Sequence, residues 1–209
     1  MWLGDLIKSL KNHGELQVKP IIIGHSMGGL LAQKIATEYH PWINGIILVA
    51  SAPPRGIPIM SWDVAVAMIK HCIPLIFNRP LKIDRKTTFN LLLGGYGDDE
   101  ISYPDEDWYD ESQEQIFQKL VPESPRVAKQ LAFSRIPVNE RKINCPTLVV
   151  AGTRDKICPL PVQLKIREKY CFSDYSQFEH GHMLMLERGQ EEIISKIFNW
   201  VLSRCYGCY

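Results

Sequence analysis

Residues 21–29 have the sequence IIIGHSMGG, and this short stretch decides the fold class. It begins with three β-branched residues, which is typical of a buried strand in a parallel sheet. Gly24 ends the apolar run, and helix-forming residues then dominate from about 27 to 39. A second apolar, β-branched run follows at 45–50. Strand, helix and strand in this order predict a βαβ unit and therefore a parallel sheet.

Strands and helices continue to alternate on either side of this unit. The first ten residues place four apolar side chains at helical spacing, which predicts an amphipathic helix. Later in the chain we expect a third strand at 147–151, a helix at 162–170, a weaker fourth strand at 175–178 and a closing amphipathic helix at 191–202. The expected fold class is therefore α/β, with a parallel sheet flanked by helices.

Residues 53–138 interrupt this pattern. They carry 9 of the 14 prolines and no strand-like run of comparable quality, so we expect a mainly helical insertion here. Its apolar groups at 62–77 and 91–93 either pack against the core or line an apolar pocket. Its acidic run at 98–114 is typical of a solvated face. The predicted organisation is a first part of the core at 1–52, an insertion at 53–138 and a second part of the core at 139–209.

The composition excludes several classes of protein. The chain has 209 residues, of which 45% are hydrophobic and 22% charged, as expected of a globular protein. A net charge of +1 at pH 7 argues against nucleic-acid binding through a basic surface. No apolar run reaches about 18 residues, so we expect no membrane span. Charges within the first ten residues are unlike a secretory signal, and six cysteines are too few for a disulfide scaffold. Both observations favour a cytoplasmic location.

Gly24, Ser26 and Gly28 form a G-x-S-x-G pattern where the first strand turns into the helix. A turn that exposes its serine is tight, so we expect both glycines to let the backbones pass without a Cβ clash. Ser26 then lies at a helix N-terminus, where free N–H groups favour a developing negative charge. A serine hydroxyl needs a nearby base to act as a nucleophile near neutral pH, and an imidazole suits that role.

Two further segments give the serine turn a chemical context. Residues 152–155 (GTRD) follow the third predicted strand, and residues 179–183 (EHGHM) follow the fourth. With these motifs in this order, the chain resembles the α/β-hydrolase family, which carries its nucleophile, acid and histidine in the order Ser, Asp or Glu, His. The resemblance covers nearly the whole chain. The insertion matches only in its position, where the family often carries a cap over the active site.

The resemblance implies roles for four residues. Ser26 is the expected nucleophile, His182 the base that takes its proton, and Asp155 the acid that orients the imidazole. The backbone N–H of Met27 is expected to be one oxyanion donor. The implied protein is a serine hydrolase that cleaves a carboxylic ester or related acyl bond of a small, apolar substrate through an acyl-enzyme on Ser26, with no cofactor. Cleavage of thioesters, lactones or C–C bonds, and perhydrolysis, stay open alternatives.

Several residues compete for these roles. His180 is the main rival of His182, which is preferred because the glycine immediately before it matches the family pattern. The side chain of His25 is expected to point away from the site and to have a packing role. Asp174 precedes its predicted strand and so would lie at the wrong edge of the sheet, whereas Ser51 leaves no carboxylate at an alternative acid position.

The cysteines offer no strong metal site. The C-x-x-C at 205–208 has no second pair, and the H-x-H at 180–182 has no third spaced histidine or nearby carboxylates. We therefore expect ordinary free thiols and no bound metal.

The position of Ser26 near the start of the chain differs from the family pattern. In the family, several strands and a long loop precede the nucleophile strand, and that loop supplies the second oxyanion N–H. The resemblance therefore implies that this chain begins inside the fold. We expect the strand at 21–23 to lie at a sheet edge, open to a partner chain or to self-association. The alternative function is a non-catalytic or weakly active hydrolase-like protein that binds a ligand or partner.

Overall fold

The computed structural model describes residues 19–58 and 136–207 and, between them, residues 84, 88, 91, 92, 115, 117–122, 124, 126 and 130. Its centre is a parallel sheet of four strands in the order β1-β2-β3-β4. The strands are β1 (Ile21–His25), β2 (Gly45–Val49), β3 (Thr147–Gly152) and β4 (Ser173–Phe178). The helices packed around them are α2 (Met27–Tyr39), α8 (Leu160–Glu168) and α9 (Gln190–Trp200). The predicted α/β class with a parallel sheet flanked by helices is confirmed.

The helices start and end close to the predicted residues. α8 begins two residues earlier than expected, because Pro161 is accommodated in its first turn, where a proline costs no helical hydrogen bond. α9 ends at Trp200, and the chain continues as a π-helical turn over Val201–Cys205. Two short 3₁₀ turns, His40–Trp42 and Glu140–Lys142, complete the described elements. The helix expected in the first ten residues lies outside the described residues.

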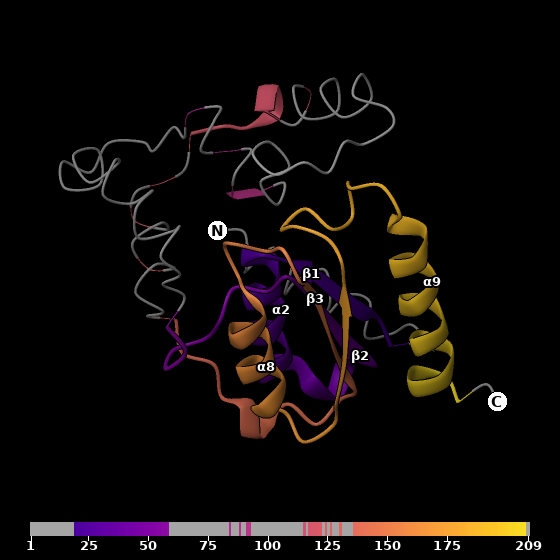
Figure 1. The fold of residues 1–209 in the computed structure, drawn as a ribbon. Helices are drawn as coiled ribbons and strands as arrows, with labels where there is room; N and C mark the ends of the chain where they lie inside the picture. Colours follow the sequence, from indigo (N-terminus) through magenta and orange to yellow (C-terminus); the bar gives the residue numbers. More distant parts are fainter. Residues whose placement is uncertain are drawn as a thin grey trace.

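The sheet is covered on both faces, as Figure 1 shows, with α2 and α8 on one side and α9 on the other. Side chains along a strand alternate between the faces, so Ile46 and Leu48 of β2 pack toward α2 and α8. Ile47 and Val49 point the other way and pack against α9. Every residue of β2 is buried, and full burial of each of its four aliphatic side chains contributes about 1.5–3 kcal/mol.

β1 forms the end of the strand order. Within the described part of the chain it pairs only with β2, in register from Ile21 opposite Gly45 to His25 opposite Val49. The side chain of Ile23 is 58% exposed, as expected for an apolar residue on an edge strand. Pairing of this edge with a partner chain or a second copy stays a prediction.

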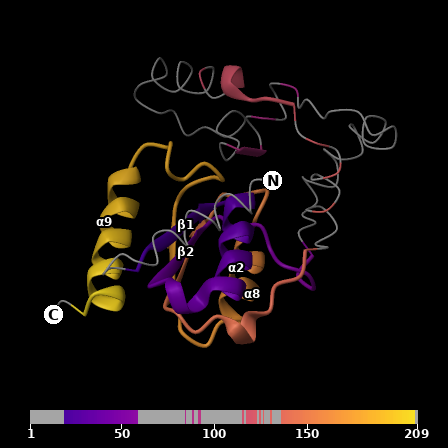
Figure 2. The ribbon, with the colours of Figure 1, turned by 180° about the vertical axis from the view of Figure 1, so that it is seen from behind.

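The two ends of the inserted segment lie side by side at the core. The backbone N–H of Arg55 donates to the carbonyl of Ile136 over 2.8 Å, which joins the two ends of the inserted segment. Ile136 also packs on a small cluster that includes Leu30 and Ala52. The described pieces of the insertion lie beyond one end of the sheet in both views (Figures 1 and 2).

Most of the predicted insertion, including the apolar group at 62–77 and the acidic run at 98–114, lies outside the described residues. The boundaries 53–138 and the mainly helical character of the insertion therefore stay predictions. No helix within the described ranges is long and apolar enough to cross a membrane.

Candidate active site

Ser26 lies in the turn between β1 and α2 with a backbone φ of 53°. This left-handed conformation costs a non-glycine residue about 1–2 kcal/mol. The turn is held from several sides. The N–H of Ser26 donates to the carbonyl of Val49 over 3.0 Å, and its own carbonyl accepts hydrogen bonds from the N–H groups of Gly29 and Ala52. These backbone bonds hold the serine at the end of β1 in its strained conformation.

The glycines around Ser26 differ in what they make room for. A Cβ on Gly24 would lie 2.3 Å from the carbonyl oxygen of Gly28, and a Cβ on Gly29 would lie 2.4 Å from the Ser51 Oγ. A Cβ on Gly28 would meet no atom of the described residues within 4 Å. The expectation that both motif glycines avoid a clash is therefore correct for Gly24 and wrong for Gly28. Gly29, directly after the motif, has that role instead.

This difference predicts unequal effects of two matched substitutions. We expect Gly24→Ala to lower the free energy of unfolding by about 3 kcal/mol, because its new methyl group meets rigid backbone. Gly28→Ala adds the same methyl group in open space, and alanine also favours the helix, so its unfolding free energy should change by less than about 1 kcal/mol. Urea unfolding of the two variants beside wild type measures both effects. Equal losses would contradict the assignment.

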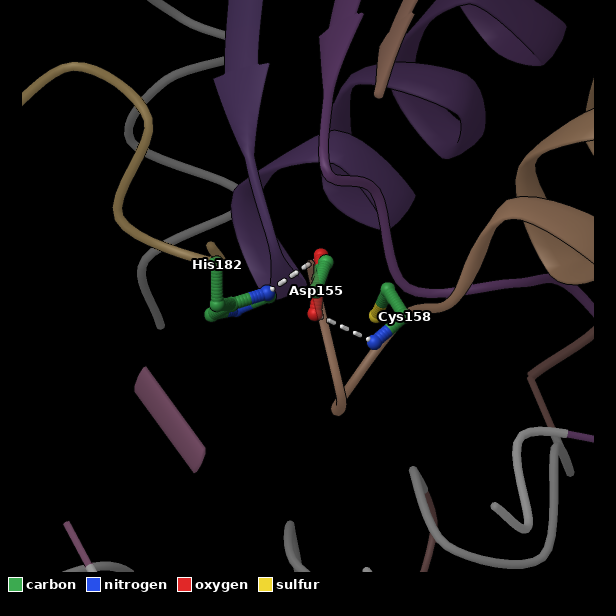
Figure 3. A group of neighbouring side chains, drawn as sticks. All are labelled: Asp155, Cys158 and His182. Carbon is green, nitrogen blue, oxygen red and sulfur yellow. Dashed lines mark hydrogen bonds and ion pairs between the residues drawn. The ribbon is translucent and has the colours of Figure 1, made fainter. Parts of the chain in front are cut away.

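His182 lies between Ser26 and Asp155. Its Nε2 atom is 2.9 Å from the Ser26 Oγ, and its Nδ1 atom is 2.9 Å from the Asp155 Oδ2. His182 and Asp155 are almost fully buried, at 2% and 3% exposure. Figure 3 shows the imidazole and the carboxylate facing each other. The three residues predicted from the sequence motifs are thus brought together in one hydrogen-bonded line.

The protonation pattern of this line follows from the donors around Asp155. Its Oδ1 accepts hydrogen bonds from the backbone N–H groups of Ile157 and Cys158, each over 2.8 Å. An ionised carboxylate has no proton to donate, so the hydrogen bond to Oδ2 must come from the His182 Nδ1–H. The Nε2 atom of a neutral His182 therefore carries a lone pair and accepts the Ser26 hydroxyl proton. This is the arrangement that a general base requires.

The backbone of His182 is also held in place. Its carbonyl accepts a 2.8 Å hydrogen bond from the His25 Nε2–H, and the two imidazole rings lie 4.9 Å apart. The prediction that the side chain of His25 points away from the site is therefore wrong. Burial, together with the neighbouring His182, lowers the pKa of His25, which favours the neutral ring. On the other side, the N–H groups of His182 and Met183 both donate to the carbonyl of Leu92 over 3.0 Å.

The rival residues lie elsewhere. The His180 Nε2–H donates to the carbonyl of Arg188 over 2.9 Å, so this ring has its own partner. Asp174 lies near the start of β4, the opposite end of the strand from the histidine loop, and accepts hydrogen bonds from Trp200 and Arg204. Ser51 is fully buried, and its Oγ accepts from the amide of Gln33. The preference for His182 and Asp155 over these rivals is consistent with the geometry.

A buried polar network connects the serine turn to the acid turn. The amide of Gln33 in α2 donates to the Ser51 Oγ over 2.9 Å and accepts from the Tyr170 hydroxyl over 2.6 Å. The amide of Gln163 in α8 donates to the carbonyls of Ser51 (2.9 Å) and Cys158 (3.3 Å). Since the Cys158 N–H holds Asp155, the network ties the two halves of the core together beside the site. No sequence motif indicates this network, because its partners are far apart in the chain.

The position of Met27 suits the predicted oxyanion role. It is the first residue of α2, and the first helical N–H groups have no partner within a helix. The first backbone donor to the Ser26 carbonyl comes from Gly29, three residues after Ser26. The Met27 N–H therefore lies at the positive end of the helix dipole, directly after Ser26 in the chain.

One group within the described residues has donor atoms close enough together to hold a metal ion. It consists of Asp155, Cys158 and His182, whose donor atoms lie within 4.8 Å of one another. Figure 3 shows that the carboxylate is already engaged by the imidazole and by the Cys158 N–H. Burial raises the pKa of the Cys158 thiol well above its usual value, and nearby Asp155 raises it further. The thiol is therefore protonated near neutral pH, and the hydrogen bonds define an acid–base pair.

The site has a serine in a strand-to-helix turn at the edge of a parallel sheet, and two later turns supply a histidine and a carboxylate. This arrangement defines the class of α/β hydrolases. Residues 3–195 match the alpha/beta hydrolase family, and the chain belongs to it. It is similar to the uncharacterized hydrolase YugF of Bacillus subtilis (strain 168), with 24% identity over 212 residues that cover 93% of this chain and 68% of YugF.

Solved structures of esterases and lipases share the fold. A thermophilic esterase from Thermogutta terrifontis has a TM-score of 0.64 at 20% identity, covering 95% of this chain and 70% of the esterase. A monoacylglycerol lipase from Paleococcus ferrophilus has a TM-score of 0.62 at 20% identity, covering 97% and 76%. The esterase RhEst1 from Rhodococcus sp. ECU1013 has a TM-score of 0.66 at 20% identity, covering 97% and 72%.

Proposed function

We propose that this protein is a serine hydrolase that cleaves a carboxylic ester or related acyl bond through an acyl-enzyme on Ser26. The observation that carries the proposal is the continuous line from the Ser26 Oγ through His182 to Asp155, with both hydrogen bonds at 2.9 Å. His182 takes the hydroxyl proton as the Ser26 oxygen attacks the acyl carbon, and Asp155 stabilises the imidazolium that forms. The same imidazole then protonates the leaving alcohol.

The second half of the reaction uses the same groups. Water enters after the alcohol leaves, and its oxygen attacks the acyl carbon as His182 takes its proton. The bond between the acyl carbon and the Ser26 Oγ then breaks, the carboxylic acid leaves, and His182 returns the proton to Ser26. The tetrahedral oxyanion of each step is stabilised by the Met27 N–H at the start of α2. No cofactor has a part in this proposed chemistry.

The proposed substrate is a small molecule with an apolar acyl group. Leu92 supports this, since its carbonyl bonds directly to the backbone at His182 and its partly buried side chain belongs to the apolar group at 91–93. We also propose a cytoplasmic location, in keeping with the free thiols of Cys145, Cys158, Cys171 and Cys205 within the described residues.

A fluorophosphonate probe tests the proposal. We expect a covalent adduct on Ser26, located by peptide mass spectrometry, that forms in wild type and in the control Ser203→Ala but not in Ser26→Ala. Ser203 is an exposed serine remote from the site, which makes it a matched control. A wild-type protein that is folded but forms no adduct would favour the alternative of a non-catalytic hydrolase-like binding protein.

Once reactivity is established, p-nitrophenyl esters of increasing acyl length test the proposed preference for an apolar acyl group. A preference for the acetate ester would contradict that part of the proposal.

A further inference from the structure

Glu187 is a buried carboxylate beside the site that the proposed chemistry does not use. Its side chain is 8% exposed, although glutamate is rarely buried without a specific partner. It lies in the loop between β4 and α9, five residues after His182. Nothing in the sequence singled it out, because the loop has no regular period.

The contacts of Glu187 are made to the His180–Gly181 peptide, directly before His182. Both carboxylate oxygens accept the backbone N–H of Gly181, over 3.0 and 2.9 Å. The next residue of the same segment, Arg188, accepts the His180 ring N–H through its carbonyl. Two successive residues of this loop, Glu187 and Arg188, therefore hold the two residues that precede His182. A charged acceptor makes such a hydrogen bond about twice as strong as a neutral one.

The opposite side of this peptide is pressed against the end of β3. A Cβ on Gly152 would lie 2.4 Å from the carbonyl oxygens of both His180 and Gly181. The Arg154 N–H also donates to the carbonyl of His180 over 3.0 Å. The peptide is thus held between the acid turn on one side and Glu187 on the other. The Arg154 N–H holds the carbonyl of this peptide, and the Glu187 carboxylate holds its N–H.

The electrostatic surroundings make this carboxylate responsive to pH. Burial raises the pKa of Glu187, the Gly181 N–H together with His180 and Arg154 opposes the rise, and Asp155 adds to it. Within the described part of the chain, His180, Arg154 and Asp155 are the side chains that act on its charge. A neutral amide at this position would accept the Gly181 N–H with less desolvation cost, so the hydrogen bond alone does not require a charge.

We propose that Glu187 is a positioning residue that fixes the His180–Gly181 peptide, directly before His182, and thereby holds the His182 imidazole opposite the Ser26 hydroxyl. The inference rests on the proposed function, since it assigns Glu187 a role in that reaction. Displacing a reacting group by about 1 Å can cost about 10²-fold in rate. Glu187 acts through backbone geometry and touches no reacting atom.

The test compares Glu187→Ala, Glu187→Gln and the control Glu191→Gln, an exposed glutamate in the first turn of α9. The first readout is the rate constant for labelling of Ser26 by the fluorophosphonate. We expect Glu187→Ala to lower it about 10- to 100-fold, Glu187→Gln to recover part of the loss, and Glu191→Gln to match wild type. The second readout is the downfield NMR resonance of the His182 Nδ1–H, which should shift or broaden in Glu187→Ala.

The pH dependence separates positioning from a purely structural role. A raised carboxyl pKa means that stability contributed by Glu187 is complete below its ordinary value of 4.5 and is lost as pH rises through the folded-state value. Glu187→Gln lacks this loss. Its unfolding free energy should therefore improve relative to wild type as pH rises, while its labelling rate stays below wild type. Lower stability of the glutamine variant together with a wild-type labelling rate would indicate a purely structural role and overturn the proposal.

The outcomes for the proposed function and for Glu187 can be told apart. If wild type forms no adduct, the proposed function fails, and the NMR resonance alone decides whether Glu187 positions His182. If wild type reacts and folded Glu187→Ala reacts at the same rate with an unchanged resonance, the positioning role is wrong. If Glu187→Ala does not fold, Glu187→Gln decides instead. A wild-type labelling rate and an unchanged His182 Nδ1–H resonance in Glu187→Gln would then overturn the positioning role.

Discussion

Replacement of Ser26 or His182 by alanine is expected to lower kcat on a p-nitrophenyl ester by about 10⁴-fold or more. Ser26→Ala removes the attacking oxygen, and His182→Ala removes the only side chain that a described hydrogen bond joins to it. Because the two groups act as a unit, the double variant should be no slower than either single variant. Steady-state rates of the three variants test this directly.

The control for this series is His180→Ala. His180 is also buried and lies two positions from His182, but its ring bonds to the Arg188 carbonyl instead of Ser26. We expect its kcat to fall by much less than that of His182→Ala. A larger loss in His180→Ala than in His182→Ala would mean that the two histidines have been assigned the wrong way round. Additive losses in the double variant of Ser26 and His182 would show that they do not act together.

The order of the site motifs along the chain could be predicted because each follows a regular element. Strand β1 and helix α2 have strong apolar and helix-forming patterns, so the serine turn between them was placed to the residue. Asp155 and His182 follow strands whose carboxyl ends meet at one edge of a parallel sheet. Sequence order and sheet topology were therefore enough to bring the three side chains near one another.

The details that hold these side chains could not be predicted, because they depend on contacts between distant loops. His25 turns toward the site because the carbonyl of His182, 157 residues later, lies within reach of its ring. Glu187 reaches back to Gly181 across an irregular loop, where neither a helical nor a strand period applies. The room required at Gly29 depends on where Ser51 lies at the end of the neighbouring strand. No local sequence pattern predicts any of these three contacts.

These contacts all compensate a free-energy cost at the site. Ser26 is held in a strained conformation and Asp155 and His182 are buried polar groups, so each costs free energy unless its partners are fixed. The backbone bonds around Ser26, the two N–H groups at Asp155 and the buried Gln33 network supply those partners. The site is thus held in one geometry before any substrate binds, which is the condition for efficient proton transfer.

Asp155→Asn is expected to lower kcat by about 10⁴-fold while leaving the fold intact. The asparagine oxygen should face the N–H groups of Ile157 and Cys158, since an NH₂ group there would oppose two donors. The NH₂ group then faces the Nδ1 atom of His182, which must become an acceptor. The ring proton therefore moves to Nε2, and His182 can no longer accept the proton of Ser26.

The matched control is Asp174→Asn, which removes a carboxylate that bonds to Trp200 and Arg204 near the start of β4. It should leave kcat near the wild-type value, although its unfolding free energy should fall slightly. The tautomer change gives a second measurement that does not depend on turnover. Nitrogen-15 NMR of the imidazole should place the ring proton on Nδ1 in wild type and on Nε2 in Asp155→Asn. A variant with the wild-type tautomer and a large loss of kcat would show that Asp155 acts by its charge alone, because its orienting hydrogen bond would then be dispensable.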